Sequence, residues 1–282
     1  MRPRLLISDL DGTLLDEQLQ IDQQDVDAVT LAHRAGMRVG VATGRMYRSG
    51  LPHALALGVD LPLICYQGAL IQELALGTSE EELAAAPVLL REEVSGELGL
   101  EVLEICRRQG YALNVYQDDH LYVDEINEDV RFYTGIAQVR AEVASDPSLE
   151  ERVRRGSTKL TVVLADRDRF PAALAELQQL IGDRAEVTRS LIGFCEITAR
   201  GVNKGHALRW LCRHLQVDPE EVVAVGDAPN DLPLLAAAGT KVAVETAAPE
   251  VKAAADWLVP GPGRGGLAEV VRRVLLSPAT SR

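Results

Sequence analysis

The chain has 282 residues, of which 47% are hydrophobic and 25% charged, so it can bury a large core and form about two domains. Its 42 acidic residues outnumber 29 lysines and arginines, which gives a formal net charge of −13 at pH 7. Because such a surface repels nucleic acid and anionic membranes, we expect neither as a partner.

The four cysteines lie far apart in the sequence and form no Cys-x-x-Cys pair, which argues against zinc and redox motifs. We expect them to be reduced, mostly buried thiols of a cytoplasmic protein. The first apolar stretch is too short for a signal peptide or a membrane span.

The two ends of the chain alternate between predicted strands and helices. Strands are predicted at residues 5–7, 37–42, 61–66, 221–225 and 241–244. Helices are predicted at residues 22–35, 203–215, 232–238 and 267–276, with another ending near residue 57 and a hairpin closing near residues 87–90. This alternation predicts a parallel sheet with right-handed crossovers.

The middle of the chain has a different pattern. It combines predicted helices at residues 96–108 and 169–181 with strands at 111–116, 120–123 and 159–164, and a hairpin of 186–189 with 194–198; residues 131–149 are irregular or helical. Hairpins mixed with helices predict an α+β module with an antiparallel sheet. We therefore expect a parallel-sheet α/β core built from residues 1–91 and 199–282, with residues 92–198 inserted.

Two carboxylates, Asp9 and Asp11, follow the first predicted strand and precede Gly12. Acids this close repel each other unless a cation or a shared proton intervenes, and oxygen ligands favour a hard cation such as Mg²⁺. A calcium loop of the EF-hand type is excluded, since Thr13, Leu14 and Gln20 occupy its remaining defining positions. Taken alone, the segment could also be a solvated turn.

Other polar groups follow other predicted core strands. Thr43 and Arg45 come after the second strand, Asp227, Asn230 and Asp231 come after a later one, and Lys204 begins a nearby helix. Ligand sites in parallel sheets lie at the carboxyl ends of the strands. We therefore expect these side chains to converge on one site.

At this point the sequence resembles the haloacid dehalogenase superfamily. The matching motifs are Asp9-x-Asp11-Gly12-Thr13, Thr43-Gly44-Arg45, Lys204, and Gly226-Asp227-x-x-Asn230-Asp231. Their order and the position of the insert resemble the Cof-type, subclass IIB phosphatases, in which a cap domain lies between the second and third motifs. The resemblance implies a Rossmann-like core with a cap, and a Mg²⁺-dependent phosphoric monoester hydrolase acting on small phosphorylated metabolites, often sugar phosphates.

The resemblance also implies the residue roles. Asp9 would attack phosphorus and become an aspartyl phosphate, while Asp11 would protonate the leaving oxygen and then activate water. Thr43 would hydrogen-bond the transferring phosphoryl group, and Lys204 would shield Asp9 and the phosphoryl oxygens.

The implied metal site consists of Asp9, the main-chain carbonyl of Asp11 and Asp227, while Asn230 and Asp231 would orient its outer shell. The implied substrate-binding residues are Gly44, Arg45 and Asn230. The inserted module is expected to supply specificity as a lid, with the hairpin at residues 189–191 as one candidate contact surface.

Two positions depart from the family pattern: Gln67 stands where asparagine is usual, and Glu245 where glycine is usual. Neither change affects the implied nucleophile or metal set, so both bear on substrate contacts. Two alternative functions stay open at this stage. One is a phosphotransferase or phosphomutase of the same superfamily, and the other is a non-catalytic ligand-binding protein on this fold.

Overall fold

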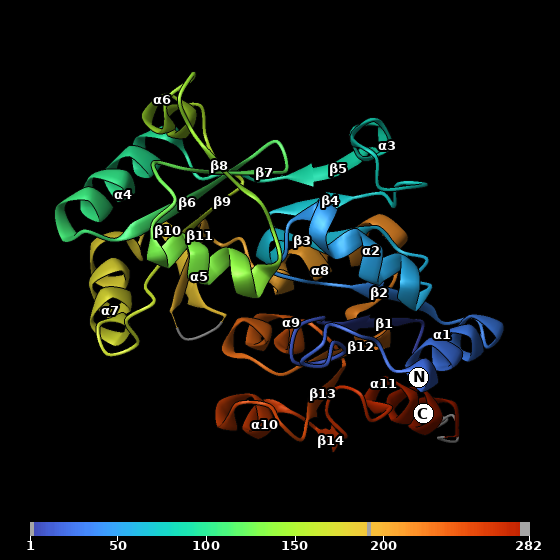
Figure 1. Ribbon diagram of the computed structural model, residues 1–282. Coiled ribbons are helices and arrows are strands. Elements are labelled where there is room, and N and C mark those ends of the chain that lie inside the picture. The colour runs from blue at the N-terminus through green and yellow to red at the C-terminus, as the bar shows by residue number, and fades with distance from the viewer. Residues whose placement is uncertain (1–2, 191–192, 277–282) are drawn as a thin grey trace.

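The central feature of the computed structural model, which describes residues 3–190 and 193–276, is a five-stranded sheet in the order β14-β13-β12-β1-β2 (Figure 1). Its strands are β1 (Leu5–Ser8), β2 (Arg38–Val41), β12 (Val222–Gly226), β13 (Thr240–Val244) and β14 (Trp257–Val259). Every pairing in this sheet is parallel, as predicted.

The register of the sheet explains where its polar residues meet. Ile7 on β1 is paired with Gly40 on β2 and with Ala224 on β12, so the three strands end at the same edge. The strands β1 and β12 are fully buried, as expected for a parallel sheet covered on both faces. The segments that follow β1, β2 and β12 are therefore neighbours.

Helices connect and cover this sheet. They are α1 (Gln23–Arg34), α2 (Tyr47–Leu57), α8 (Lys204–Leu215), α9 (Leu232–Ala236), α10 (Pro249–Ala254) and α11 (Gly266–Leu276), with the short helices η2 (Pro219–Glu221) and η3 (Pro229–Asp231). The first and last of these helices, α1 and α11, pack against each other, which places the two ends of the described chain close together (Figure 1). The described residues include no helix that is both long and apolar enough to cross a membrane.

A small antiparallel sheet extends from the core. It contains β3 (Leu63–Cys65), β4 (Leu70–Gln72) and β5 (Val88–Arg91), with η1 (Tyr66–Gly68) between the first two strands. The predicted hairpin is therefore present, and the chain between β4 and β5 also forms helix α3 (Glu80–Ala85). Ser79 caps this helix with a capping box, a local signal that the hydrophobic pattern did not show.

The middle of the chain forms a six-stranded sheet in the order β10-β11-β9-β6-β7-β8. The strands are β6 (Ala112–Gln117), β7 (His120–Val123), β8 (Ala141–Val143), β9 (Lys159–Val163), β10 (Ala185–Arg189) and β11 (Phe194–Ala199). The sheet is antiparallel except that β8 pairs with β7 in parallel. Residues 131–149, predicted to be irregular or helical, contain the end of α5 (Glu128–Ala137) and this extra strand.

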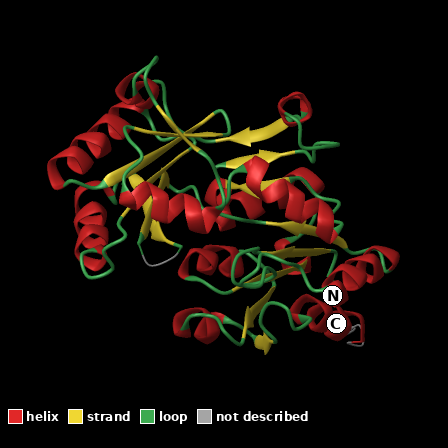
Figure 2. Ribbon diagram, viewed as in Figure 1, coloured by secondary structure: helices red, strands yellow, loops and turns green. Residues whose placement is uncertain are grey.

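The six-stranded sheet has one face turned outward and one turned toward the core. On the outer face, Leu113, Val162 and Ile197 form an apolar cluster with α4 (Gly96–Gln109), α6 (Leu149–Arg154) and α7 (Phe170–Ile181), which lie along the outside of the sheet in Figure 2. On the other face, Tyr116 and Phe194 belong to the hydrophobic cluster of the core.

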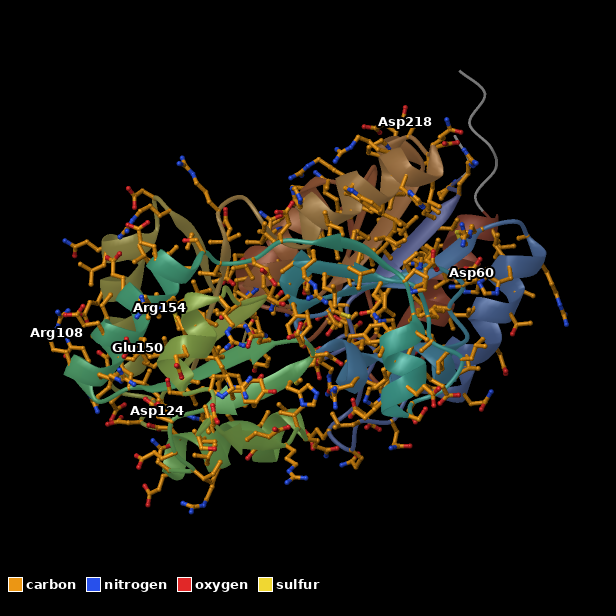
Figure 3. All side chains as sticks on the ribbon, turned by 90° about the horizontal axis from the view of Figure 1, so that it is seen from above. Asp60, Arg108, Asp124, Glu150, Arg154 and Asp218 are labelled. Atoms are coloured by element: carbon orange, nitrogen blue, oxygen red, sulfur yellow. The ribbon has the colours of Figure 1, made fainter. Side chains whose placement is uncertain are left out.

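We propose that this sheet and its helices are the inserted cap domain at residues 92–198. Figure 3, seen from above, shows the labelled charged side chains of this part and of the core at opposite ends of the molecule. In this view Arg108, Asp124, Glu150 and Arg154 lie at one end, whereas Asp60 and Asp218 lie on the core side. Between these two parts lie buried polar side chains, including those of Lys159 and Glu196.

Candidate active site

The carboxylates of Asp9 and Asp11 lie at the carboxyl end of β1, as predicted. Asp9 is buried, with 4% of its surface exposed, because its amide continues the ladder to the Val225 carbonyl of β12. Gly12 has a φ of 78°, and a Cβ atom there would collide with the Asp227 carboxylate. A glycine is therefore required at position 12 for the segment after β1 to approach the segment that carries Asp227.

Lys204 connects the acidic segment that follows β1 to the one that follows β12. It is the first residue of α8, whose preceding residue Asn203 caps the helix by accepting from His206 N. The Lys204 Nζ lies 2.7 Å from Asp9 Oδ1 and 2.6 Å from Asp231 Oδ1 and is fully buried. Burial opposes the charged form, but Asp231 and Asp9 outweigh it and raise the pKa of Lys204. The lysine is therefore charged at neutral pH.

Asp231 fixes the loop after β12. Its Oδ2 accepts hydrogen bonds from Asp227 N at 3.0 Å and from Ala228 N at 3.1 Å, while its other oxygen accepts from Lys204. Asp227 in turn accepts a 2.9 Å hydrogen bond from the Thr13 hydroxyl. Asp231 thus shapes the loop and aims Asp227 toward Asp9.

Three carboxylates, those of Asp9, Asp227 and Asp231, each place an oxygen within 4.8 Å of the others. Burial and the neighbouring Asp231 charge raise the pKa of Asp9 well above its ordinary value, and burial followed by Asp231 raises the pKa of Asp227 to about 7. Two buried acids, Asp9 and Asp231, and the half-buried Asp227 face one lysine, so acidic groups are in excess. An all-oxygen, over-charged cluster of this kind fits a hard divalent cation such as Mg²⁺.

The second predicted motif lies beside the first. Thr43 is fully buried, and its hydroxyl accepts a 3.1 Å hydrogen bond from Arg45 N. The Arg45 guanidinium donates to Asp11 through Nε at 2.8 Å and Nη2 at 2.6 Å. The Asp11 side chain therefore points to Arg45 and is not part of the three-carboxylate cluster, which agrees with a metal contact through its main chain only.

Two charged side chains of the six-stranded sheet, Lys159 and Glu196, reach this site although the sequence reasoning did not select them. The Lys159 Nζ donates to Glu196 Oε1 at 3.0 Å and to the Gly44 carbonyl at 2.8 Å. Both side chains are buried, with at most 5% exposed. A charged residue inside an otherwise apolar strand, as in Phe194–Ala199, is the sequence signal that could have found them.

A second link between the two parts involves Asp119 in the turn between β6 and β7. Its carboxylate accepts from Tyr47 N and Arg48 N, each at 2.9 Å, and from the Tyr66 hydroxyl at 2.6 Å. The first residues of α2 have no side-chain cap of their own. Asp119 therefore caps a core helix from the other sheet.

Two other sequence predictions have different outcomes. Glu245, expected to bring an anion near the site, forms a half-exposed ion pair of 3.0 Å with Arg264. In the hairpin suggested as a contact surface, Arg189 lies 3.9 Å from Glu250 of α10, and Leu191 lies outside the described residues.

Comparisons with known proteins agree with this geometry. Residues 6–271 match the family of haloacid dehalogenase-like hydrolases. The structure of TM0651 from Thermotoga maritima is similar, with a TM-score of 0.80, 30% identity and 98% of each chain covered. So is that of the subclass IIB sugar phosphatase BT4131, with a TM-score of 0.79, 22% identity and coverage of 96% of this chain and 98% of that one.

A sequence relative with a named activity is the HMP-PP phosphatase of Cronobacter sakazakii. It is 27% identical over 256 residues, covering 89% of this chain and 87% of the relative. The predicted fold class, an α/β core of the haloacid dehalogenase type, is confirmed by the structural comparisons.

Proposed function

Since the chain belongs to the haloacid dehalogenase-like hydrolases, we propose that it is a Mg²⁺-dependent phosphatase of small phosphorylated metabolites that works through an aspartyl phosphate. The observation that carries the proposal is the ion pair of Asp9 and Lys204, 2.7 Å apart and buried at the strand end from which Asp11 also projects. It supplies a carboxylate nucleophile, a cation for phosphoryl oxygens and a second carboxyl group for proton transfer.

In the first half-reaction, a carboxylate oxygen of Asp9 attacks phosphorus, and the bond from phosphorus to the leaving oxygen breaks. Asp11 gives its proton to that leaving oxygen. Lys204 and the Thr43 hydroxyl stabilise the negative charge that is spread over the phosphoryl oxygens in the transition state. The product alcohol then dissociates, and the aspartyl phosphate remains on the enzyme.

In the second half-reaction, Asp11, now a carboxylate, takes a proton from water. The water oxygen bonds to phosphorus, the bond between phosphorus and the Asp9 oxygen breaks, and inorganic phosphate forms. Asp9, the main-chain carbonyl of Asp11 and Asp227 would hold Mg²⁺, with Asp231 orienting the site, and the bound ion would supply neutralisation of charge on the phosphoryl group. Gly44, Arg45 and Asn230 are proposed to contact the substrate.

The proposed substrates are sugar phosphates or similarly small, hydroxylated metabolites. The names of BT4131, a sugar phosphatase, and of the HMP-PP phosphatase support a small phosphorylated substrate. Lys159 and Glu196, which pair with each other beside the Gly44 carbonyl, make this side of the site polar and so support a hydrophilic leaving group.

A panel of phosphorylated metabolites, with Mg²⁺ and with excess chelator, tests the function. We expect release of inorganic phosphate that requires Mg²⁺. Phosphate recovered on an added alcohol or sugar acceptor, in place of free phosphate, would identify a phosphotransferase. Acid quenching with ³²P-labelled substrate tests the intermediate: alkali-labile label should remain on the wild-type protein and be absent from Asp9→Ala.

A further inference from the structure

Gln67 lies where the two parts of the molecule meet. Its main-chain amide donates to the Thr43 carbonyl at 3.1 Å, and the preceding Tyr66 amide donates to the Arg45 carbonyl at 3.0 Å. Both residues are buried and have positive φ, 51° for Tyr66 and 59° for Gln67. Non-glycine residues adopt this conformation only where the surroundings enforce it. The base of the Gln67 side chain is therefore held firmly against the second motif.

The Gln67 amide joins two residues that do not contact each other. Its Nε2 donates to Glu196 Oε2 on β11. Its Oε1 accepts a 3.0 Å hydrogen bond from Asn230 Nδ2 in η3, which also contains Asp231 and directly follows the segment with Asp227. A single side chain thus connects the six-stranded sheet to the motif at residues 226–231.

Glu196 determines which atom of the Gln67 side-chain amide faces which partner. An ionised carboxylate only accepts hydrogen bonds, and Lys159 keeps Glu196 paired. The Gln67 NH₂ must therefore face Glu196, so its oxygen faces Asn230. That oxygen in turn requires the NH₂ of Asn230, which turns the Asn230 carbonyl oxygen the other way.

The side-chain carbonyl oxygen of Asn230 is the end of this chain of hydrogen bonds. It is buried and has no hydrogen-bond partner among the described residues. Leaving a buried acceptor unpaired is unfavourable. Such an orphaned oxygen, held in place from behind, is suited to accept a hydrogen bond from a substrate group or a bound water.

We infer that Gln67 is a positioning residue: it transmits the closed position of Glu196 to Asn230, so that the amide of Asn230 is oriented only when the cap sheet contacts the core. The inference rests on the proposed function, which it deepens by linking contact between the cap sheet and the core to the motif at residues 226–231. It also gives a physical role to the departure from asparagine at position 67. Asparagine tolerates the same backbone conformation but is one methylene shorter and cannot reach both partners.

The test compares the effect of Glu196→Gln in two backgrounds, wild type and Gln67→Asn. Lys159 would take the oxygen of the substituted amide, so that its NH₂ would face the NH₂ of Gln67. The hydrogen bonds from Glu196 through Gln67 to Asn230 would then be broken. We expect kcat for p-nitrophenyl phosphate with Mg²⁺ to fall about tenfold in the wild-type background and less than about twofold in Gln67→Asn, while KM changes little. An equal fall of kcat in both backgrounds overturns the inference.

Gln72 supplies the matched control. It is also a buried glutamine, but its amide donates to the Leu83 and Ala86 carbonyls and contacts neither Glu196 nor Asn230. In the Gln72→Asn background, Glu196→Gln should keep its full effect on kcat. A loss of the effect there as well would show that any buried glutamine change masks it, which also overturns the inference.

A second readout does not need turnover, so it separates this inference from the proposed function. The side-chain amide of Asn230, identified in ¹⁵N spectra by its absence in Asn230→Ser, should shift on Glu196→Gln only when Gln67 is present. An unshifted Asn230 signal in the wild-type background contradicts the inference even if the enzyme is an active phosphatase.

Glu196→Gln leaves Lys159 without a carboxylate and could unfold the protein. The paired change Lys159→Met with Glu196→Met removes both charges at similar volume, which proteins often tolerate. We expect this variant to remain folded by circular dichroism and to reproduce the loss of kcat and the shift of the Asn230 signal. A folded variant with wild-type kcat and an unshifted signal overturns the inference.

Discussion

Arg45 holds the carboxylate of Asp11 through two hydrogen bonds, 2.8 Å from Nε and 2.6 Å from Nη2. Arg45 is nearly buried at 9% exposure of its side chain, whereas the Asp11 side chain is 43% exposed. A planar guanidinium fixes the orientation of a carboxylate in a way that a lysine cannot. The proposed proton-transfer group is thus oriented by its neighbour in the second motif.

The first prediction follows from this pair. Arg45→Lys keeps the charge but loses the two-bond geometry, so kcat should fall about 10- to 100-fold, as expected for a misplaced reacting group. Steady-state kinetics with p-nitrophenyl phosphate checks it. The control is Arg38→Lys, which alters a comparable pair with Asp60 on the surface of the core and should retain kcat. Full activity in Arg45→Lys would contradict the orienting role.

The second prediction concerns the nucleophile. Asp9→Asn is nearly isosteric but removes the anionic oxygen that attacks phosphorus, so turnover should fall more than about 10³-fold with the fold retained. Phosphate release and circular dichroism on the same preparation check it. Asp124→Asn, which changes an exposed acid far from the site, should keep wild-type turnover. Unchanged phosphate release by pure Asp9→Asn protein would refute the mechanism.

The third prediction concerns the metal. Asp227→Ala removes one of the few oxygens of the acidic cluster, so the Mg²⁺ concentration for half-maximal activity should rise at least about tenfold. A Mg²⁺ titration of activity checks it, with Asp183→Ala, a change of an exposed acid, as the control. Activity of the wild type that survives excess chelator would show that the cluster does not serve a metal.

The fourth prediction concerns the contact between the two parts of the molecule. Asp119→Asn leaves one of the α2 amides, Tyr47 N or Arg48 N, without an acceptor, at a cost of about 1–3 kcal/mol. The contact between the six-stranded sheet and the core should weaken. We expect faster hydrogen exchange at these two amides and a higher KM for the preferred metabolite.

The neighbouring residue Asp118 provides the control for this contact. It occupies the same turn and also pairs with a core residue, Arg91, but at the exposed surface and without binding the α2 amides, so Asp118→Asn should leave hydrogen exchange at residues 47 and 48 unchanged. Equal exchange in both variants would mean that Asp119 does not hold the two parts together.

The fifth prediction concerns stability and pH. Burial raises the pKa of Asp25 from 3.8 to about 6, although its carboxylate accepts a hydrogen bond from Ala268 N. The folded state thus binds a proton more tightly than the unfolded state, so this group lowers stability as pH rises from about 3.8 to about 6. Asp25→Asn keeps the acceptor oxygen and removes the charge.

Urea unfolding at pH 5.0 and pH 7.5 measures this effect. The free energy of unfolding of Asp25→Asn relative to wild type should increase by about 1 kcal/mol between the two pH values. A difference that stays constant would mean that Asp25 does not titrate with a raised pKa.

The sequence by itself predicted the parallel-sheet core and placed Asp9, Thr43 and Asp227 just after its strands, where the structure has them. Hydrophobic runs that end near Asp9, Thr43 and Asp227 indicate parallel strands, and the carboxyl ends of parallel strands meet at one edge because the strands run in the same direction. Local signals such as Asp22 and Asn203 at helix starts set the helix boundaries to within about two residues. These patterns are short-range, so they can be read directly.

Only the tertiary structure decided which residues meet across the two parts. Lys159, Glu196 and Asp119 lie in a sheet whose placement on the core depends on the packing of buried faces, and each contacts residues roughly 70 or more positions away. The sequence marked Gln67 as unusual but could not name its partners. Hydrogen bonds between distant segments depend on distances of about 3 Å, which follow from the packed structure and from no local pattern.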